Sequence, residues 1–391
     1  MIKNGNRLQI QYGNTMATDR LGYYLVGWKK FYNKTLALME SKTTGYEVQW
    51  VFNDDIYGSI DWTTPIETPL LEIYKKRAQQ LRDKYDYLML YFSGGADSAV
   101  ILRTFVENNI FLDEIVMQLP EPVRQSFKPD DTSEANFYAE IEYSAVPYLN
   151  KIKNKIHPNT KIRYQDFAKS GFEVLKKDNW LEAVPLCTNI TLSGVFRQIA
   201  QNNDHHILDL YSTGKSIAQI LGIDKPLVYF DGKSYYSYFM DTSTYHYVSP
   251  VDFNDTELSK GKYATEFFYW TPDMPEIVVK QAQEIKKNCE VNSLARLMAS
   301  EILDRHISEY RPIIHPVIYP NDVTIEFQTE KPSSRIIRPM DRWFWLTASE
   351  QIKQNYLGAI DYMKKQVDPK YLIKQNIQYG LTAHKSKLYK L

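Results

Sequence analysis

The sequence predicts an α/β fold with an open, mostly parallel sheet, a short N-terminal α+β section and a mainly helical C-terminal part. Three observations support this prediction. Apolar strand-like runs alternate with amphipathic helical segments over residues 85–215. The run Asp86–Phe92 is almost wholly apolar, which is typical of a strand buried on both faces of a parallel sheet. After about residue 225 the alternation stops. We therefore expect three parts, residues 1–65, 66–225 and 226–391.

The composition is that of a globular protein with no charge bias. Of 391 residues, 47 are Lys or Arg and 47 are Asp or Glu, so the net charge gives no global attraction to nucleic acid. The two cysteines, Cys187 and Cys289, form no CxxC pair, which excludes a structural zinc site with several thiolates. So few cysteines indicate a reducing compartment, and we expect a cytoplasmic protein. The chain shows neither a signal peptide nor an apolar run that could span a membrane, so we expect no membrane partner.

The N-terminal section, residues 1–65, combines helical and strand-like patterns. Apolar residues recur at helical spacing over Asp19–Ser41, which predicts a helix. Glu47–Phe52 alternates between polar and apolar residues, which predicts a strand. Pro69 then marks the start of a helix predicted over Leu70–Lys84.

The central part, residues 66–225, is predicted to hold four strands with helices between them. After the strand Asp86–Phe92, a helix over Ala99–Asn108 leads to a second apolar strand at Asp113–Leu119. Such a strand–helix–strand unit is a right-handed crossover. The remaining predicted elements are helices over 137–149, 167–177 and 193–201, a short strand at 161–164 and a fourth strand at Ile207–Tyr211.

The C-terminal part, residues 226–391, is predicted to start with a hairpin and to continue as helices. Leu227–Tyr238 has the pattern of a β-hairpin with Asp231-Gly232 at its turn. A lysine-rich tail begins at Lys364. The remaining predicted elements are helices over 275–288, 293–310 and 343–365, and an extended proline-rich segment over 312–339.

The segment that indicates chemistry is Ser93–Ser98, with the sequence SGGADS, between the first core strand and its helix. Its two glycines let the backbone turn sharply and approach a ligand closely. Backbone N–H groups of the loop and of the helix start converge there, and the helix dipole favours an anion. The loop therefore suits a polyphosphate. Asp97 would repel phosphate unless Mg²⁺ lies between them, so we expect Asp97 to be a catalytic residue and a metal ligand. The alternative is an ordinary Gly-Gly turn capped by Asp97 or Ser98. The expected nucleotide-binding residues are Ser93, Gly94, Gly95, Ala96, Asp97 and Ser98.

This unit resembles the pyrophosphate loop of the N-type ATP pyrophosphatases, the PP-loop superfamily with an adenine nucleotide alpha-hydrolase-like fold. The family includes the synthetase domains of asparagine, NAD, GMP and tRNA lysidine synthetases and the thiouridine synthases. The match is close at Tyr91–Ser98, and the sheet pattern agrees over roughly residues 66–220. The resemblance implies ATP and Mg²⁺ as cofactors, release of pyrophosphate, and transfer of AMP to a substrate oxygen from which a nucleophile then displaces it. It also implies that adenine meets the backbone of Val116 and Met117.

A second glycine-containing loop, Leu210–Ser216, follows the predicted fourth strand. Its Gly-Lys-Ser sequence is not a Walker A motif, because that motif requires glycine where this chain has Asp209. Its position matches the second Gly/Ser loop of asparagine synthetases, although the acidic residues that follow the glycine in that family are missing. Ser212 and Gly214 are therefore candidate α-phosphate ligands, and Lys215 is a candidate catalytic residue that offsets charge in the transition state. The alternative is an ordinary turn with a solvated lysine.

Departures from the family pattern narrow the options. Ile2 stands where glutamine-dependent asparagine synthetases have their catalytic cysteine, and the first 60 residues are too short for a glutaminase domain. The amide nitrogen is then expected from ammonia, an amine or another protein. The cysteines match neither the thiol-dependent nor the zinc-containing branch, and we expect both to be buried. Pro185–Thr191 stands where the family keeps threonines beside the substrate, which makes Thr188 and Asn189 candidate substrate contacts.

The substrate that accepts AMP stays open. The first hypothesis is an enzyme, asparagine synthetase-like, that adenylates a carboxylate or carbonyl oxygen of a small molecule and forms a C–N bond. The second is an enzyme that modifies a base in tRNA or DNA, because Lys331–Arg342 is a basic stretch beside aromatic residues and the tail is rich in lysine. The third is a non-catalytic nucleotide sensor, because the second loop is altered. The sequence does not indicate an oligomeric state.

Overall fold

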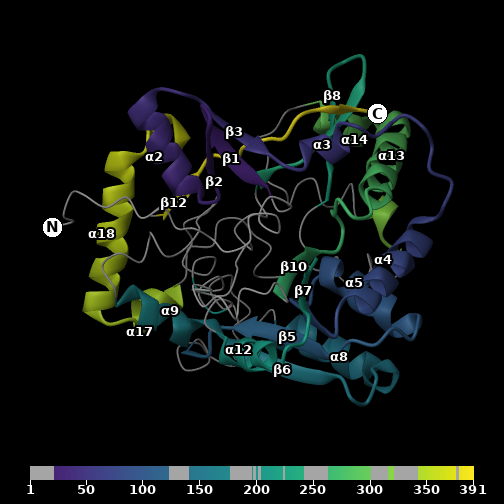
Figure 1. The fold of residues 1–391 in the computed structure, drawn as a ribbon, viewed down its shortest axis with the longest axis horizontal. Coiled ribbons are helices and arrows are strands. Elements are labelled where there is room, and N and C mark those ends of the chain that lie inside the picture. Colours follow the sequence, from purple (N-terminus) through teal and green to yellow (C-terminus); the bar gives the residue numbers. More distant parts are fainter. Residues whose placement is uncertain are drawn as a thin grey trace.

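The chain forms an α/β fold around a five-stranded sheet in which all strands are parallel (Figure 1). The computed structural model describes residues 22–122, 141–176, 196, 200, 204–222, 225–241, 263–300, 316–320, 342–375 and 378–391. The strands run in the order β10-β7-β4-β5-β6. Their bounds are β4 (Tyr87–Tyr91), β5 (Glu114–Leu119), β6 (Lys161–Asp166), β7 (Ile217–Leu221) and β10 (Tyr263–Phe267). The predicted α/β class with a parallel sheet is confirmed. The division into three parts stays a prediction, and the sheet takes β10 from beyond residue 225.

One face of the sheet is covered by two helices that flank the central strand in sequence. Helix α4 (Leu70–Lys84) begins after Pro69, whose φ of −61° already suits a helix start, and it buries Ile73 and Leu81 completely. Helix α5 (Ala96–Glu107) packs against α4, and both contact β4. Helix α13 (Glu276–Val291) covers α4 in turn. These helices occupy the right-hand side of Figure 1.

The other elements surround this core. Between β5 and β7 lie η1 (Ile141–Ala145), α8 (Val146–Ile152), η2 (Lys153–Lys155), α9 (Phe167–Leu175) and α12 (His205–Ser212). An antiparallel sheet joins β8 (Leu227–Phe230) and β9 (Tyr235–Tyr238) to β13 (Tyr389–Lys390), which confirms the predicted hairpin. The remaining elements are α3 (Asp54–Tyr57), α14 (Ser293–Ala299), α17 (Arg342–Thr347), α18 (Glu350–Gln366), η5 (Pro369–Tyr371), β11 (Leu372–Gln375) and β12 (Gln378–Leu381).

The fourth core strand lies elsewhere than the sequence predicts. Ile207–Tyr211 belongs to helix α12, and the strand is Ile217–Leu221. Both segments are apolar runs of five residues, and periodicity alone cannot separate a strand from a helix at this length. The correction moves the loop before Ile217 from the end of a strand to its beginning, with consequences for the site described below.

The start of the chain differs from its predicted helix over Asp19–Ser41. Its described residues form an antiparallel sheet, β2-β1-β3, from β1 (Tyr23–Val26), β2 (Lys29–Phe31) and β3 (Val48–Val51). Gly27 has a φ of +58° and turns the β1–β2 hairpin, a conformation that interrupts a helix. Helix α2 (Lys34–Thr44) begins only afterwards, where the Asn33 side chain accepts a hydrogen bond from Leu36 N at 3.1 Å. The predicted strand over 47–52 is confirmed.

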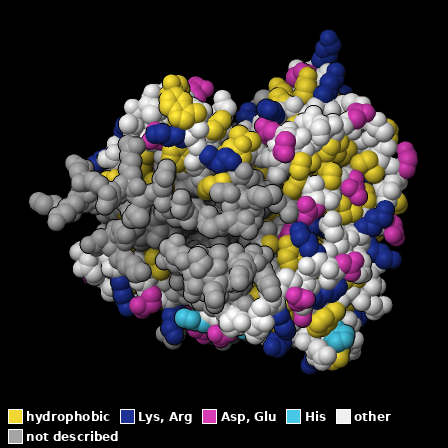
Figure 2. Space-filling view, in the orientation of Figure 1, with side chains coloured by type: hydrophobic (Ala, Val, Ile, Leu, Met, Phe, Trp, Pro, Cys, Tyr) yellow, Lys and Arg dark blue, Asp and Glu magenta, His cyan; other side chains and the backbone are white. Residues whose placement is uncertain are grey.

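The lysine-rich tail is part of the folded structure. Strand β13 pairs with β9, and the Tyr389 hydroxyl donates to the Asp54 carboxylate at 3.2 Å. Lys387 forms an ion pair with the same carboxylate, and the side chain of Leu391 is buried. On the face shown in Figure 2, basic and acidic side chains of the described residues are interspersed. The described tail therefore packs against the protein instead of extending as a free basic arm.

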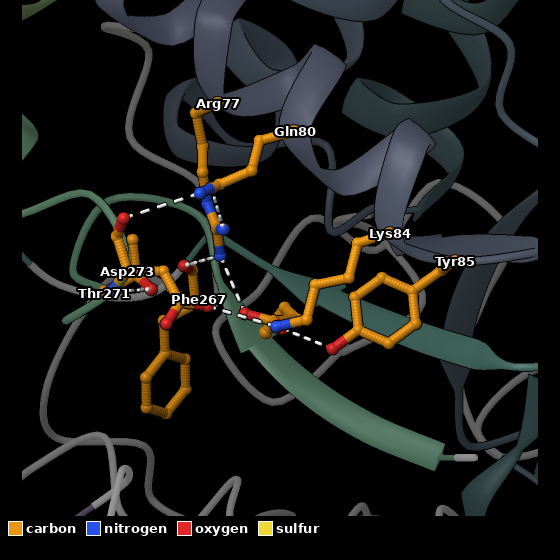
Figure 3. Close-up of polar contacts among 8 residues, drawn as sticks. Arg77, Gln80, Lys84, Tyr85, Phe267, Thr271 and Asp273 are labelled. Carbon is orange, nitrogen blue, oxygen red and sulfur yellow. Dashed lines mark hydrogen bonds and ion pairs between the residues drawn. The ribbon is translucent and has the colours of Figure 1, made fainter.

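A buried carboxylate, Glu266 on β10, ties the sheet to α4. Arg77 Nη2 donates to Glu266 Oε2 at 2.8 Å, and Lys84 Nζ lies 3.0 Å from Glu266 Oε1, which also accepts from the Tyr85 hydroxyl. Figure 3 shows the side chains of Arg77 and Lys84 pointing toward the end of β10 beside Phe267. Burial raises the pKa of Glu266, but the charges of Arg77 and Lys84 outweigh this effect and lower the pKa to about 2.

The length and apolar character of the described helices bear on whether the chain could span a membrane. None of the helices in these ranges combines the length and apolar character that crossing a bilayer requires.

Candidate functional site

The SGGADS loop follows the central strand β4 at the carboxyl edge of the parallel sheet, the edge where open α/β sheets bind ligands. Gly94 has a φ of +71°, and a Cβ atom on it would lie 2.6 Å from the backbone N of Ala145 in η1. The Ser144 hydroxyl also donates to the Gly94 carbonyl. Only glycine fits at this position, because both the backbone conformation and the close approach of η1 exclude a side chain.

Two serines brace the loop from within. Ser98 Oγ donates to the Gly95 carbonyl at 3.1 Å and accepts from Ser93 N at 3.3 Å. The two serine hydroxyl oxygens lie 3.4 Å apart. Gly95 is the N-cap residue of α5 and brings no side chain to the N–H groups of the first helical turn. Among the described residues, no side chain caps this helix start, so the cap by Asp97 or Ser98 considered as the alternative is not formed.

Asp97, in the first turn of α5, is held by residues from three distant segments. Its Oδ1 accepts from Tyr319 Oη at 2.6 Å and lies 2.5 Å from Lys225 Nζ. The Tyr269 hydroxyl donates to the backbone carbonyl of Asp97 at 2.8 Å. The Asp97 side chain is 24% exposed, whereas that of Lys225 is 3% exposed. The carboxylate is therefore accessible to a solute, while its cationic partner is buried.

The ammonium group of Lys225 also lies over two aromatic rings. Its Nζ is 4.6 Å from the ring centre of Tyr269 and 5.3 Å from that of Tyr319, distances that favour cation–π attraction. Burial, followed by the negative charge of Asp97, raises the pKa of Tyr319 well above its usual value. Burial also raises the pKa of Tyr269. Both hydroxyls are therefore neutral hydrogen-bond donors at physiological pH.

The sequence analysis missed Lys225, Tyr269 and Tyr319, together with Gly222. A Cβ on Gly222, which follows β7, would lie 3.2 Å from Asp97 C, so this glycine lets β7 approach the loop. The apolar run Ile217–Leu221 followed by glycine is the signal that could have placed a carboxyl-edge turn here. No local pattern marks the two tyrosines, because the folded chain brings them to the site from remote segments.

The second loop does not reach the first. In the parallel register Tyr87 pairs with Ile217, so Lys215 and Gly214 lie at the amino edge of the sheet and Ser93 at the opposite edge. A five-residue strand separates these edges by about 16 Å. Lys215 lies over the Tyr87 ring at 5.7 Å, and Ser212 belongs to the last turn of α12. The structure thus does not bring the candidates Ser212, Gly214 and Lys215 to the SGGADS loop, because the fourth strand begins after them.

The expected adenine contacts lie on the strand next to the loop. Val116 and Met117 are buried in β5, and Val116 pairs with Tyr91 of β4. The Val116 carbonyl accepts from Phe92 N at 2.8 Å, which holds the start of the loop against β5. The contact of this backbone with adenine stays a prediction.

The acidic residues near the loop show whether the site could hold the expected Mg²⁺. In the ranges that the structure describes, no group of three or more His, Cys, Asp or Glu residues could hold a metal ion. Mg²⁺ bound with a nucleotide requires only one or two protein carboxylates, because phosphates and water supply its other ligands. The partly exposed Asp97 carboxylate beside the loop fits that requirement. The residues present suit an ion that arrives with ATP.

Several expected contacts lie outside the described residues. These are Thr188, Asn189 and the basic stretch Lys331–Arg342 except for its last residue, which opens α17. Cys187, which is expected to be buried, also lies outside the described residues. The other cysteine, Cys289, is buried in α13 as expected, and burial raises its thiol pKa to about 11.

Comparisons with known proteins do not assign the chain. No protein-family model matches it, and no curated protein matches it.

Proposed function

We propose that this protein is an AMP-forming ATP pyrophosphatase of the PP-loop type. The observation that carries the proposal is the SGGADS loop between the buried central strand and α5, at the ligand-binding edge of a parallel sheet. A P-loop would need a different glycine spacing and a lysine within its sequence, and Ser93–Ser98 has neither. The cap residue Gly95 brings no side chain to the N–H groups of the first turn of α5, which supports an anion-binding role for this backbone.

In the proposed reaction, the loop binds the β- and γ-phosphates of ATP through backbone N–H groups at the start of α5 and the hydroxyl of Ser93. The Ser98 hydroxyl joins them by turning its proton from the Gly95 carbonyl to a phosphate oxygen. Asp97 would hold the Mg²⁺ that accompanies ATP, an ion that would offset the charge of the phosphates. A carboxylate or carbonyl oxygen of the substrate attacks the α-phosphorus, and the bond to the bridging oxygen breaks, with its electron pair leaving on pyrophosphate. An amine nitrogen then attacks the adenylated carbon, and the C–O bond to AMP breaks with its electron pair leaving on AMP. The nitrogen loses a proton to solvent, and the product carries a new C–N bond.

Product analysis with radiolabelled ATP, Mg²⁺ and pooled amino acids or nucleotides tests the proposal. We expect AMP and pyrophosphate, and substrate-dependent ATP–pyrophosphate exchange that identifies the acceptor of AMP. Asp97→Asn removes the charge with little change of shape and is expected to lower AMP formation by about 100-fold, as removal of one transition-state electrostatic contact does. Asp231→Asn, at the exposed β8–β9 turn, is the matched control. Formation of ADP and inorganic phosphate, or equal activity of the two variants, would contradict the proposal.

The two alternative functions predict different results in the same assays. A nucleotide sensor binds ATP without steady AMP release. An enzyme acting on a nucleic-acid base shows exchange only with tRNA or DNA, and its binding weakens as salt rises. Two features motivated the nucleic-acid hypothesis, the basic stretch Lys331–Arg342 and the lysine-rich tail. The tail packs against β9 and Asp54 instead of extending as a free arm, whereas the stretch before Arg342 lies outside the described residues.

A further inference from the structure

Lys225 is a buried cation at the carboxyl edge of the sheet, beside the SGGADS loop. Its side chain is 3% exposed, and its Nζ lies 2.5 Å from Asp97 Oδ1. Lysine is rarely buried without a partner, because removing an ammonium group from water is costly. The carboxylate that stabilises it belongs to the residue expected to meet Mg²⁺.

A second buried lysine shows how a purely structural pair differs. Lys34 and Asp241 lie 2.5 Å apart with both side chains fully buried. Lys34 also donates to the Thr382 carbonyl at 2.5 Å, and Asp241 accepts from the Tyr24 hydroxyl at 2.8 Å. The Asp97 side chain, in contrast, is 24% exposed and lies in a loop suited to anions, so a solute can reach one member of this pair.

The charges at the site favour an exchange of partners. Asp97 and a bound pyrophosphate group would repel each other at short range, and Lys225 can offset only one of them fully. Magnesium that enters with ATP provides Asp97 with a new cationic partner. The Lys225 ammonium can then bind phosphate oxygens, while Tyr319, which donates to the same Asp97 oxygen, keeps the carboxylate oriented.

We propose that Lys225 is a phosphate-binding residue that is paired with Asp97 in the free protein and transferred to the pyrophosphate group when the nucleotide binds. The inference rests on the proposed function, since it assigns the Ser93–Ser98 loop to pyrophosphate. It predicts that Lys225 contributes to anion binding even when Asp97 carries no charge, which a purely structural ion pair would not do.

Titration calorimetry with inorganic pyrophosphate in EDTA tests this directly. The proteins compared are the wild type, Lys225→Met, Lys225→Arg, Asp97→Asn and the double variant. We expect Asp97→Asn to bind pyrophosphate several-fold more tightly than the wild type, because a repulsive charge is lost and Lys225 is released. We expect Lys225→Met to weaken binding about 10-fold in both the wild-type and the Asp97→Asn backgrounds, as loss of a charge-assisted contact does, and Lys225→Arg to retain most of the affinity.

The comparison in the Asp97→Asn background decides the matter. Equal affinity of Asp97→Asn and the double variant would overturn the inference and leave Lys225 with a structural role. If Lys225→Met unfolds because it removes the cation paired with the Asp97 carboxylate, the double variant, which removes both charges, still gives this comparison. Failure of the wild type to bind millimolar pyrophosphate would also overturn it. ATP cleavage to ADP with Lys225-dependent pyrophosphate binding would contradict only the proposed function, whereas AMP formation with Lys225-independent binding would contradict only the inference.

Discussion

Two carboxylates in this fold, the buried Glu266 and the partly exposed Asp97, have opposite surroundings. Glu266 on β10 lies between two cations, Arg77 and Lys84, and its side chain is only 6% exposed. Asp97 at the start of α5 forms an ion pair with Lys225 and is 24% exposed. Both also accept a tyrosine hydroxyl hydrogen bond. Glu266 is thus enclosed by two positive charges, whereas Asp97 is paired with a lysine and stays accessible to solutes.

This difference separates structural charge from functional charge. A carboxylate between two cations has nothing to gain from a further ligand, and it joins β10 to α4. A partly exposed carboxylate that is paired with a lysine beside the SGGADS loop can change partner at lower cost. We therefore expect substitutions at Glu266 to affect folding and substitutions around Asp97 to affect ligand binding and turnover.

The largest effect is expected from Gly94→Ala, which would break the loop that positions Asp97. The new Cβ would lie 2.6 Å from Ala145 N and 2.8 Å from its Cα, and residue 94 keeps a φ of +71°. We expect AMP formation to fall by about 100-fold or more, because a displacement of about 1 Å at a reacting centre has this effect. Unfolding by urea should show a loss of about 3 kcal/mol from the combined clash and strain.

Gly232→Ala is the matched control for this substitution. Gly232, at the β8–β9 turn, has a φ of +93°, but no atom lies within 4 Å of its added Cβ. We expect only the cost of a left-handed conformation, about 1–2 kcal/mol, and unchanged AMP formation. Equal turnover in the two alanine variants would show that the loop geometry does not matter for the reaction.

The predictable part of this site is the part that is local in sequence. The loop Ser93–Ser98, its apolar strand and the helix after Pro69 are each specified by a few adjacent residues, and the structure has them where the sequence indicates. Lys225 and Tyr319 reach Asp97 only through the tertiary fold, so no neighbouring residues announce them. The strand at Ile217–Leu221 was missed for a different reason, because α12 contains an equally short apolar run with the same local signal.

The second prediction concerns Glu266→Gln, which tests the structural side of the comparison. The pKa of Glu266 is lowered from 4.5 to about 2, so the ionised form contributes about 3 kcal/mol to stability at neutral pH. A carboxylate with a lowered pKa stabilises the fold above its unfolded-state pKa and loses this contribution as the pH falls through its folded-state pKa. We expect the stability gap between wild type and variant, measured by urea unfolding, to narrow as the pH falls from about 4.5 toward 2.

Glu107→Gln is the control, because Glu107 forms an exposed ion pair with Arg103 along α5 and should contribute less than about 0.5 kcal/mol. A gap for Glu266→Gln that stays constant with pH would mean that its charge is not what stabilises β10 against α4. Below the unfolding temperature, AMP formation by Glu266→Gln should match the wild type.

A smaller effect is expected from Tyr319→Phe, which removes the hydrogen bond from this hydroxyl to Asp97. Loss of a 2.6 Å hydrogen bond to a charged group should weaken Mg-ATP binding about 10-fold, measured as a higher KM for ATP in the exchange assay. The matched control is Tyr389→Phe in the tail, which removes a tyrosine hydroxyl that donates to the Asp54 carboxylate. This substitution should leave the KM for ATP unchanged. If both variants behave alike, Tyr319 only stabilises the fold and does not orient Asp97.

The smallest effect is expected from Lys215→Ala, which compares the two edges of the sheet. Lys215 belongs to a Gly-Lys-Ser sequence that suggests phosphate binding, yet it precedes β7 and lies beside Tyr87 at the amino edge, about 16 Å from the loop. At physiological ionic strength a charge at that distance is largely screened, because the Debye length is about 8 Å. We expect AMP formation and pyrophosphate affinity within about 2-fold of the wild type, since a solvated surface charge is worth less than about 0.5 kcal/mol. A 100-fold loss of AMP formation in Lys215→Ala would contradict the proposal. It would mean that the phosphates bind at the amino edge of the sheet, because one triphosphate group cannot contact both Lys215 and the SGGADS backbone.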